Sequence, residues 1–225
     1  FEKTALDDVD LTIEKGEFIG IIGHTGSGKS TLIQHLNGLI HPTCGKVTID
    51  GVDLAEKSKA AVAKRHSVGM VFQYPEHQLF EETVAKDIAF GPMNLGCDEE
   101  EAGKRVKSAM KFAGLDYDTF AGRSPFRLSG GQQRRVAIAG VIAMHPDCIV
   151  LDEPTAMLDP LGRKEVMDTI HELNRSEGIT IVLITHFMEE AVTADHVLVV
   201  DRTKLQMQGT AREVFSQAEI GRAHV

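Results

Sequence analysis

The eight residues Gly23-His-Thr-Gly-Ser-Gly-Lys-Ser30 match G-x-x-x-x-G-K-[ST], the pattern of a phosphate-binding loop, or P-loop. The apolar run Phe18–Ile22 comes directly before the loop and is typical of a buried central strand. A helical pattern follows from Lys29 to about Leu39. A strand, a glycine-rich turn and a helix in this order are the context in which the pattern is diagnostic. The stretch therefore predicts an α/β fold that binds phosphate groups.

The chemistry of the loop follows from its residue types. Glycines allow backbone N–H groups to curl around phosphates, Lys29 reaches the β- and γ-phosphates, and the Ser30 hydroxyl binds Mg²⁺. An ordinary glycine-rich turn, the alternative, does not account for the flanking strand and helix. We therefore expect ATP and Mg²⁺ as ligands. The predicted ATP-binding residues of this region are Gly23, His24, Thr25, Gly26, Ser27, Gly28, Lys29, Ser30 and Thr31.

A second candidate element is the apolar strand Cys148–Leu151, which is followed by Asp152 and Glu153. Ligands of open α/β sheets bind at the carboxyl ends of the strands, so Asp152 is the expected Mg²⁺ partner. Glu153 is placed to orient or deprotonate an attacking water, because phosphoryl transfer depends mainly on positioning and charge stabilisation. An acidic strand end alone is usually a solvated turn, and this interpretation therefore rests on the P-loop earlier in the chain.

Composition narrows the classes of protein and partner. The 225 residues fit one large or two small domains, and a hydrophobic content of 42% suffices for a packed core. Lys and Arg total 24 against 33 Asp and Glu, a net charge of −9, which disfavours a nucleic-acid partner. Three widely spaced cysteines without a C-x-x-C pattern indicate a reducing, cytoplasmic setting. No apolar run reaches the roughly 18 residues of a spanning helix.

Hydrophobic periodicity predicts strands that alternate with helices. Residues 83–144 are mainly helical in pattern, with the acidic run Asp98–Glu101 at a helix start. The fold class is therefore α/β, with a mostly parallel central sheet, a small antiparallel β layer and a helical subdomain at about residues 83–145. The predicted strands are Val9–Ile13, Phe18–Ile22, Lys46–Asp50, Val68–Gln73, Cys148–Leu151, Ile179–Ile184 and Val197–Val200, and Pro160–Glu177 is a predicted helix.

The segment Leu128-Ser-Gly-Gly-Gln-Gln-Arg134 opens another helical stretch, Gln133–Met144. Ser129 and the two glycines offer hydroxyl and backbone donors at a helix N-terminus, which makes a second surface for an anion. On the residues alone a helix cap is the simpler interpretation, since Ser before a helix is mostly a cap.

Taken together, the motifs resemble the ATP-binding-cassette (ABC) ATPase family over almost the whole chain. The resemblance implies a P-loop NTPase fold, here a single domain over residues 1–219. It also implies that one chain holds half of each site, because the Leu128–Gln132 segment closes over ATP held by a partner's P-loop. The motifs, in order, are Gly23–Ser30, Gln73, Leu128–Gln132, Ile149–Glu153, Leu158–Asp159 and His186.

The same resemblance implies residue roles. Glu153 would be the catalytic base, His186 would bond the γ-phosphate, and Gln73 would contact Mg²⁺ and the attacking water. Leu158–Asp159 would cross the dimer interface. Spacing alone identifies neither His186, which otherwise looks like a strand-end histidine, nor Gln73, which looks like a surface polar residue. The implied sets are Glu153, His186 and Gln73 for catalysis, Ser30, Gln73 and Asp152 for the metal, and Ser129, Gly130, Gly131 and Gln132 for the partner's nucleotide.

Within that family, Phe72–Val84 and Ile88–Asn94 are similar to energy-coupling factor (ECF) transporter ATPases, which energise uptake of vitamins and transition-metal ions. Tyr74-Pro-Glu76 and Glu81-Glu-Thr83 favour one of two paired ATPase subunits over a homodimeric type. The resemblance implies a peripheral protein at the cytoplasmic face of the cell membrane. Its expected partners are a sister ATPase in a heterodimer, a transmembrane scaffold protein and a substrate-binding membrane protein, without nucleic acid.

Both ends of the chain depart from the family pattern. The sequence starts at Phe1 without methionine, so we expect the natural N-terminus to lie upstream, together with the family's adenine-stacking aromatic, for which Phe1 is a weak substitute. Ile220–Val225 breaks the helical pattern and is expected to be a non-native tail, with a real C-terminal tail as the alternative. ECF ATPases continue past residue 215 into a region that helps hold the dimer, so the resemblance does not extend to activity of this chain alone.

Two other functions compete with a transporter motor. A soluble ABC ATPase acting on ribosomes or DNA usually has two cassettes, a long coiled-coil insertion or basic surfaces, and the sequence has none of these. A P-loop kinase for small molecules would share the loop at Gly23–Ser30. The segment Leu128–Gln132 argues against the kinase.

Overall fold

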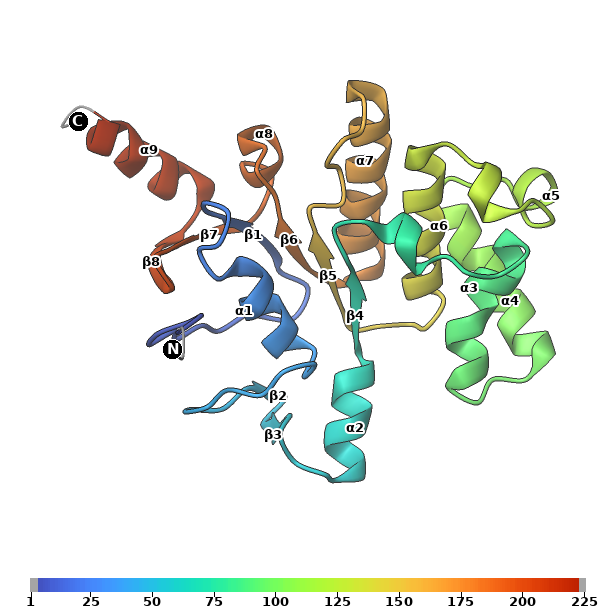
Figure 1. Ribbon diagram of the computed structural model, residues 1–225, viewed down its shortest axis with the longest axis horizontal. Helices are drawn as coiled ribbons and strands as arrows, with labels where there is room; N and C mark the ends of the chain where they lie inside the picture. Colours follow the sequence, from blue (N-terminus) through green and yellow to red (C-terminus); the bar gives the residue numbers. More distant parts are fainter. Residues whose placement is uncertain (1–3, 223–225) are drawn as a thin grey trace.

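The computed structural model describes residues 4–222, without the side chains of Pro75, Glu76 and residues 217–222. Its centre is a six-stranded sheet in the order β4-β5-β6-β1-β7-β8 (Figure 1). The first five strands in this order run parallel, and β8 pairs antiparallel with β7. The mostly parallel sheet is therefore confirmed. The strands are β1 (Phe18–Ile22), β4 (Val68–Val71), β5 (Cys148–Asp152), β6 (Thr180–Ile184), β7 (His196–Asp201) and β8 (Lys204–Gly209).

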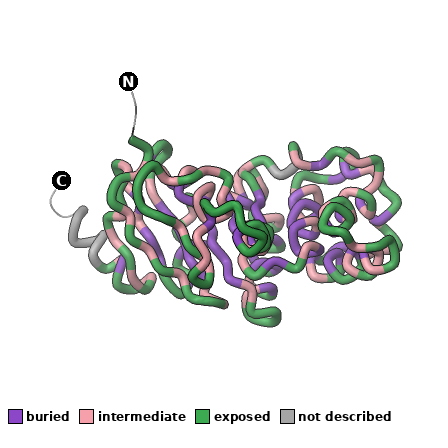
Figure 2. Tube along the Cα trace, turned by 90° about the horizontal axis from the view of Figure 1, so that it is seen from below, coloured by how far each residue is buried: buried purple, intermediate pink, exposed green. Residues whose placement is uncertain are grey.

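Helices cover both faces of this sheet, because both faces of its central strands are apolar. In β6, Ile181 and Leu183 pack on the side of α7 (Pro160–Glu177), whereas Val182 and Ile184 pack on the side of α1 (Lys29–Leu36). Buried residues accordingly follow the central strands in Figure 2, with exposed residues outside them. The sheet thus lies between two layers of helices, and loops follow the ends of its strands.

A group of helices stands beside the sheet, as predicted from Thr83 onward (Figure 1). Its interior contains the fully buried Ile88, Met110 and Ile138. The acidic run Asp98–Glu101 lies at the start of α4, as predicted. Asp98 caps this helix by accepting a hydrogen bond from the Glu101 backbone N–H. The helices are α3 (Val84–Asn94), α4 (Glu99–Phe112), α5 (Tyr117–Phe120) and α6 (Gly130–Ile142).

The short elements complete the chain. The small antiparallel layer is the hairpin of β2 and β3. Its first strand, β2, is shorter than the predicted strand Lys46–Asp50. None of the helices formed within residues 4–222 is long and apolar enough to span a bilayer. The short elements are β2 (Thr48–Ile49), β3 (Val52–Asp53), α2 (Lys59–His66), η1 (Pro75–Gln78), η2 (Pro125–Arg127), α8 (Met188–Ala191) and α9 (Ala211–Arg222).

The prediction of a strand at Val9–Ile13 was wrong. Val9, Leu11 and Ile13 are half-buried between exposed neighbours, so the alternation is real, but it comes from packing on the apolar cluster beside α1 and not from a strand ladder. At the C-terminal end, α9 runs to Arg222, so the helix is not broken at Ile220. Phe1, the weak substitute for an adenine-stacking residue, and the last three residues lie outside the described part of the chain.

Candidate functional site

The predicted P-loop lies between β1 and α1 (Figure 1). Gly23 has a φ of 153°, and a Cβ there would lie 2.0 Å from the Val200 carbonyl oxygen of β7. Gly28, the residue before α1, has a φ of 113°. Both positions therefore require glycine, one for the close approach to β7 and one for the left-handed turn into the helix.

Lys29 points back along the loop. Its Nζ donates hydrogen bonds to the carbonyl oxygens of Gly23, at 2.7 Å, and His24, at 2.9 Å. Burial lowers the pKa of Lys29 from its ordinary value, against the carboxylates of Glu153 and Asp152, which raise it. The Ser27 Oγ nearby is buried without a hydrogen-bond partner among the described residues. A bound phosphate would offer acceptors to both groups, so the loop fits an anion.

Asp152 ends β5 and is only 8% exposed. Burial raises the pKa of its carboxyl, and the like charge of Glu153 adds to the effect. A hydrogen bond from Ser30 and the charges of Lys29 and His186 act in the opposite direction. A Mg²⁺ ion in phosphate-binding sites is commonly held by one or two protein oxygens together with phosphate oxygens. The adjacent hydroxyl and carboxylate of Ser30 and Asp152 fit that donor set.

Glu153 lies at the centre of the three residues predicted for catalysis. Its Oε2 accepts a hydrogen bond of 2.9 Å from Gln73 Nε2, and its Oε1 lies 2.6 Å from His186 Nε2. Gln73, Glu153 and His186 follow β4, β5 and β6, which are neighbours in the sheet. Parallel strands end at the same edge, so residues about 110 positions apart in sequence converge there. The arrangement places one carboxylate between an amide and an imidazole beside the P-loop.

The segment around Ser129 forms the start of a helix. Ser129 Oγ accepts a hydrogen bond from the Gln132 backbone N–H at 3.3 Å, and Gln132 Oε1 accepts one from the Ser129 N–H at 3.1 Å. This is a capping box at the start of α6, so the interpretation of Ser129 as a helix cap is confirmed. Ser129 and Gly130 are nevertheless exposed. A pocket of about 560 Å³ beside the P-loop includes Gly23, His24, Thr25, Thr185 and His186 in its lining, and no residue of this segment.

Comparison with known proteins identifies the family. The family model described as "ABC transporter" matches residues 6–156. The energy-coupling factor transporter ATP-binding protein EcfA2 of Clostridium perfringens is 54% identical over 220 residues, which are 97% of this chain and 77% of that protein. The chain belongs to the ECF transporter ATPases of the ABC family. EcfA1 of Caldanaerobacter subterraneus is also 54% identical, over 96% of this chain and 76% of that protein.

Solved structures agree with the assignment of this ECF ATPase to the ABC family. The cbiO1 protein of Clostridium perfringens, part of the ABC transporter complex cbiONQ, superposes with a TM-score of 0.87 at 39% identity, over 97% of this chain and 87% of that one. A dimeric ATP-binding cassette in a post-hydrolysis state with ADP and Pi gives 0.81 at 32% identity, over 92% and 91%. The chain is therefore an ATP-binding and ATP-hydrolysing transporter subunit. These relatives give no support to action on ribosomes or DNA.

Sequence reasoning missed several residues that shape the site of this ECF ATPase. Arg134 of α6 is 3% exposed, and its Nη1 donates to the Pro154 carbonyl oxygen at 2.6 Å, directly after Glu153. The sequence signal that could have identified Arg134 is a charged residue next to the apolar stretch Val136–Ile142. Glu190 is also buried, and its carboxylate accepts a hydrogen bond from Thr185, next to His186.

Replacing Asp152 with Asn should raise the stability of the empty protein near neutral pH. The pKa of Asp152 in the folded protein is raised above its ordinary value of 3.8. The neutral carboxyl therefore stabilises the folded state at low pH, and this stabilisation is lost as pH rises through the folded-state pKa and the buried group becomes charged. An amide has no such loss. Thermal unfolding of both proteins across a pH series measures the difference, which should shrink toward about pH 4. Asn at the exposed Asp147, before the same strand, is the control, and an equal gain there would contradict the explanation.

Proposed function

We propose that this ATPase drives uptake of vitamins or transition-metal ions by an ECF-type importer, as a peripheral subunit at the cytoplasmic face of the membrane. Its relatives carry the name energy-coupling factor transporter ATP-binding protein, which supports transport as the process that the ATP hydrolysis drives. The observation that carries the hydrolytic part is the contact of Glu153 with both Gln73 and His186 beside the P-loop. A carboxylate held by two side chains beside the P-loop supports the role of a general base that acts on a water near the γ-phosphate.

In this proposal each of these residues has a defined role. Backbone N–H groups from Gly23 to Thr31 and the Lys29 ammonium hold the phosphates. Ser30, Asp152 and Gln73 would hold Mg²⁺, which would neutralise charge on the phosphates. Glu153 accepts a proton from the attacking water, and His186 donates a hydrogen bond to the γ-phosphate. The proximity of Gln73 and His186 keeps the carboxylate oriented until that proton moves.

A composite site gives a role to Ser129, Gly130, Gly131 and Gln132, which do not line the pocket beside the P-loop. In this proposal they cover the ATP of a sister ATPase subunit, with a heterodimer favoured over a homodimer. The exposed N–H groups of a helix N-terminus suit that task, because the positive end of the helix attracts phosphate. Each chain contributes a single ABC ATPase domain over residues 1–219, including the helical subdomain at 83–145, to two shared sites.

Replacing Ser129 with Ala separates its two roles. Loss of the cap should lower the free energy of unfolding by about 1 kcal/mol, and loss of the partner's phosphate contact should also lower ATP turnover. Ser58, which caps α2 in the same way by accepting from the Ala61 N–H, provides the matched control. Ser58→Ala should lose similar stability and keep turnover, as measured by chemical unfolding and steady-state ATPase assays. Equal turnover in both variants would leave Ser129 with the cap alone.

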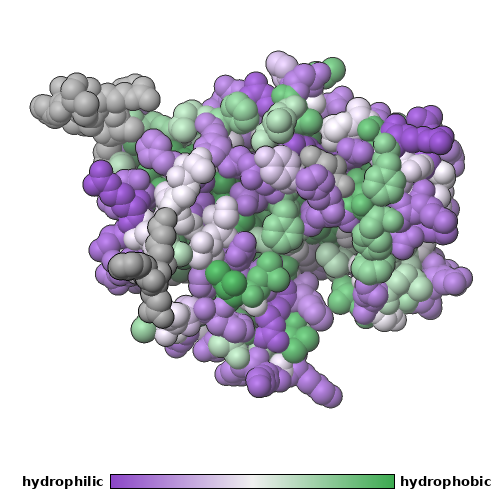
Figure 3. Space-filling view, in the orientation of Figure 1, coloured by the Kyte–Doolittle hydropathy of each residue, from purple (hydrophilic) through white to green (hydrophobic). Residues whose placement is uncertain are grey.

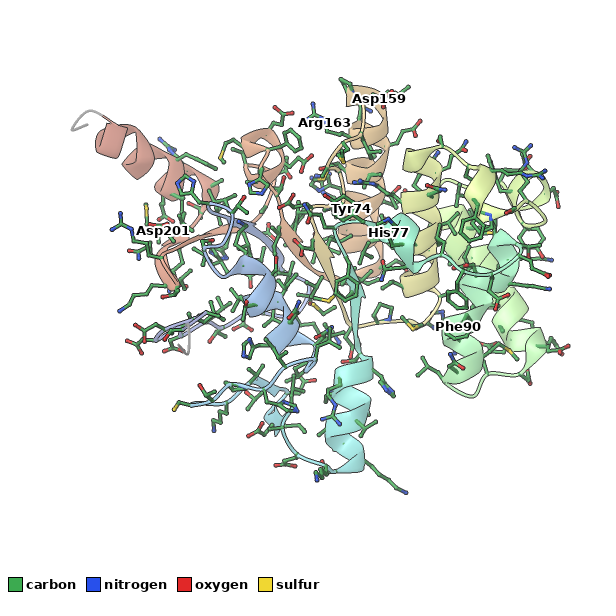
Figure 4. All side chains as sticks on the ribbon, in the orientation of Figure 1. Tyr74, His77, Phe90, Asp159, Arg163 and Asp201 are labelled. Atoms are coloured by element: carbon green, nitrogen blue, oxygen red, sulfur yellow. The ribbon has the colours of Figure 1, made fainter. Side chains whose placement is uncertain are left out.

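An exposed apolar surface supports a membrane-bound partner. Phe80 and Phe90 stack edge to face at 4.7 Å and are 54% and 45% exposed, and Phe72, Tyr74 and Met93 are exposed as well. Figure 3 shows apolar side chains gathered over the end of β4 and over α3, and Figure 4 shows Tyr74 and His77 between the sheet and Phe90. Exposed apolar patches of this kind mark protein contacts. In this proposal helices of the transmembrane scaffold protein dock there, and that protein carries the substrate-binding membrane protein.

Co-purification from cells that express the complete gene tests the transporter function. We expect a sister ATPase and membrane subunits to be recovered with the tagged protein in mild detergent. Recovery of ribosomal or DNA-repair proteins in their place would overturn the proposal. Replacing Phe80 and Phe90 with Ser should release the membrane subunits while the sister ATPase stays bound.

A further inference from the structure

Arg163 connects α7 to the loop that carries His186. Its guanidinium lies 4.2 Å from the centre of the Phe187 ring, and its Nη1 lies 3.0 Å from Glu189 Oε1. Its side chain is only 22% exposed. Figure 4 shows Arg163 at the N-terminal end of α7, on the side of α8, and Phe187 directly follows His186 in sequence. One side chain of α7 thus holds the residue next to the predicted γ-phosphate ligand.

The other side of the same loop is fixed to the protein interior. Glu190, 5% exposed, accepts a hydrogen bond of 2.5 Å from Thr185 Oγ1. That hydroxyl in turn accepts a hydrogen bond of 3.0 Å from the Phe187 backbone N–H. Thr185 therefore cannot shift easily, because its partner is a buried carboxylate. His186 lies between this buried anchor and the contact of Arg163 with Phe187.

The start of α7 is at the same time a surface segment. Asp159 caps the helix by accepting a hydrogen bond of 2.7 Å from the Gly162 N–H, and Arg163 follows within the first turn. Met157 and Leu161 are 87% and 65% exposed on either side of Asp159. Two exposed apolar side chains on one short segment suit contact with another protein surface. Any displacement of Asp159 moves Arg163 with it, since both belong to one capped helical turn.

We propose that Arg163 is a positioning residue that links the Leu158–Asp159 segment to His186 through Phe187. The inference rests on the composite site proposed above, in which this segment meets the sister ATPase. Closure of the two subunits presses on the start of α7, and the guanidinium stacked on Phe187 transmits the shift to His186. Glu189 is 71% exposed, so its ion pair with Arg163 contributes little to stability, and the role assigned to Arg163 is to set the geometry of the loop.

Steady-state ATPase assays on the assembled complex from the complete genes test this link. Arg163→Ala should lower kcat about tenfold, because small misplacements of catalytic groups are costly, while KM for ATP and the melting temperature stay unchanged. Arg163→Lys keeps a charge for Glu189 but lacks the flat guanidinium, so it should restore only part of kcat. The control is Lys164→Ala, which removes the neighbouring exposed ion pair with Asp168 and should leave kcat unchanged.

A double mutant shows whether the effect passes through His186. In single-turnover assays, Arg163→Ala should have little further effect once His186 is Ala, because a shared route makes the two losses non-additive. A full additional loss of rate in that background would overturn the proposed route. The link is also overturned if Arg163→Ala matches Lys164→Ala, or if KM and melting temperature change together with kcat. A wild-type complex that does not hydrolyse ATP would reject the composite ATPase site itself.

Discussion

Glu153→Gln should lower ATP turnover by about 10²- to 10⁴-fold and leave ATP binding intact. The amide has the same size as the carboxylate and retains one oxygen that can accept the hydrogen bond from Gln73. It cannot take a proton from water, so hydrolysis stops at the bound nucleotide. With the sister subunit present, the variant should accumulate as a closed dimer holding ATP. Nucleotide-binding assays, phosphate release and size-exclusion chromatography measure the three properties.

The control for this substitution is Glu172→Gln on the exposed side of α7, where the same chemical change lies outside the site. It should hydrolyse ATP at the wild-type rate. Near-normal hydrolysis by Glu153→Gln would remove Glu153 from the role of base. Loss of ATP binding by Glu153→Gln would indicate damage to the site, and it would contradict a role of Glu153 in hydrolysis alone.

Lys29→Ala should weaken ATP binding by about 10- to 100-fold, because a charge-assisted hydrogen bond contributes roughly 1.5–3 kcal/mol. The substitution removes the charge that faces the β- and γ-phosphates. It also removes the bonds to the Gly23 and His24 carbonyl oxygens, which shape the empty loop. Calorimetric titration with ATP and with ADP measures the affinity for each nucleotide.

Two comparisons make this second prediction specific. Lys59→Ala, at the exposed first residue of α2, removes one positive charge far from the loop and should bind ATP normally. Lys29→Arg keeps the charge in a larger group and should bind worse than wild type, since Lys29 is 5% exposed and has little space around it. Unchanged ATP affinity in Lys29→Ala would contradict the P-loop assignment.

The elements around the P-loop were predictable because local pattern and tertiary role agree there. Phe18–Ile22 forms a strand with the predicted bounds, and α7 has the predicted bounds Pro160–Glu177, with Asp159 as its cap and Gly178 at its end. The strand predicted at Val9–Ile13 failed for the opposite reason. Alternating burial on a packed surface produces the same pattern as a strand, and only the pairing partner distinguishes them.

The site itself was predictable only in part. The loop residues and the acids after β5 follow from spacing and strand ends, but Gln73 and His186 needed the family resemblance. Their contacts with Glu153 depend on the order β4-β5-β6 in the sheet, which local sequence does not encode. Arg134, Arg163 and Glu190 were missed because their roles come from tertiary contacts, although a charge beside apolar residues was a signal for the first. The assigned roles of the site residues remain predictions.

The two contacts of Glu153 also bear on newly synthesised chains. Before assembly, both oxygens of that carboxylate already face groups of its own chain, Gln73 and His186. In the proposed composite site, a free subunit therefore has its base already held in place but lacks the covering segment of a partner. Cells that make this protein in excess of its membrane partners should lose little ATP to the surplus, and the amount of assembled complex, not the amount of ATPase, should determine consumption.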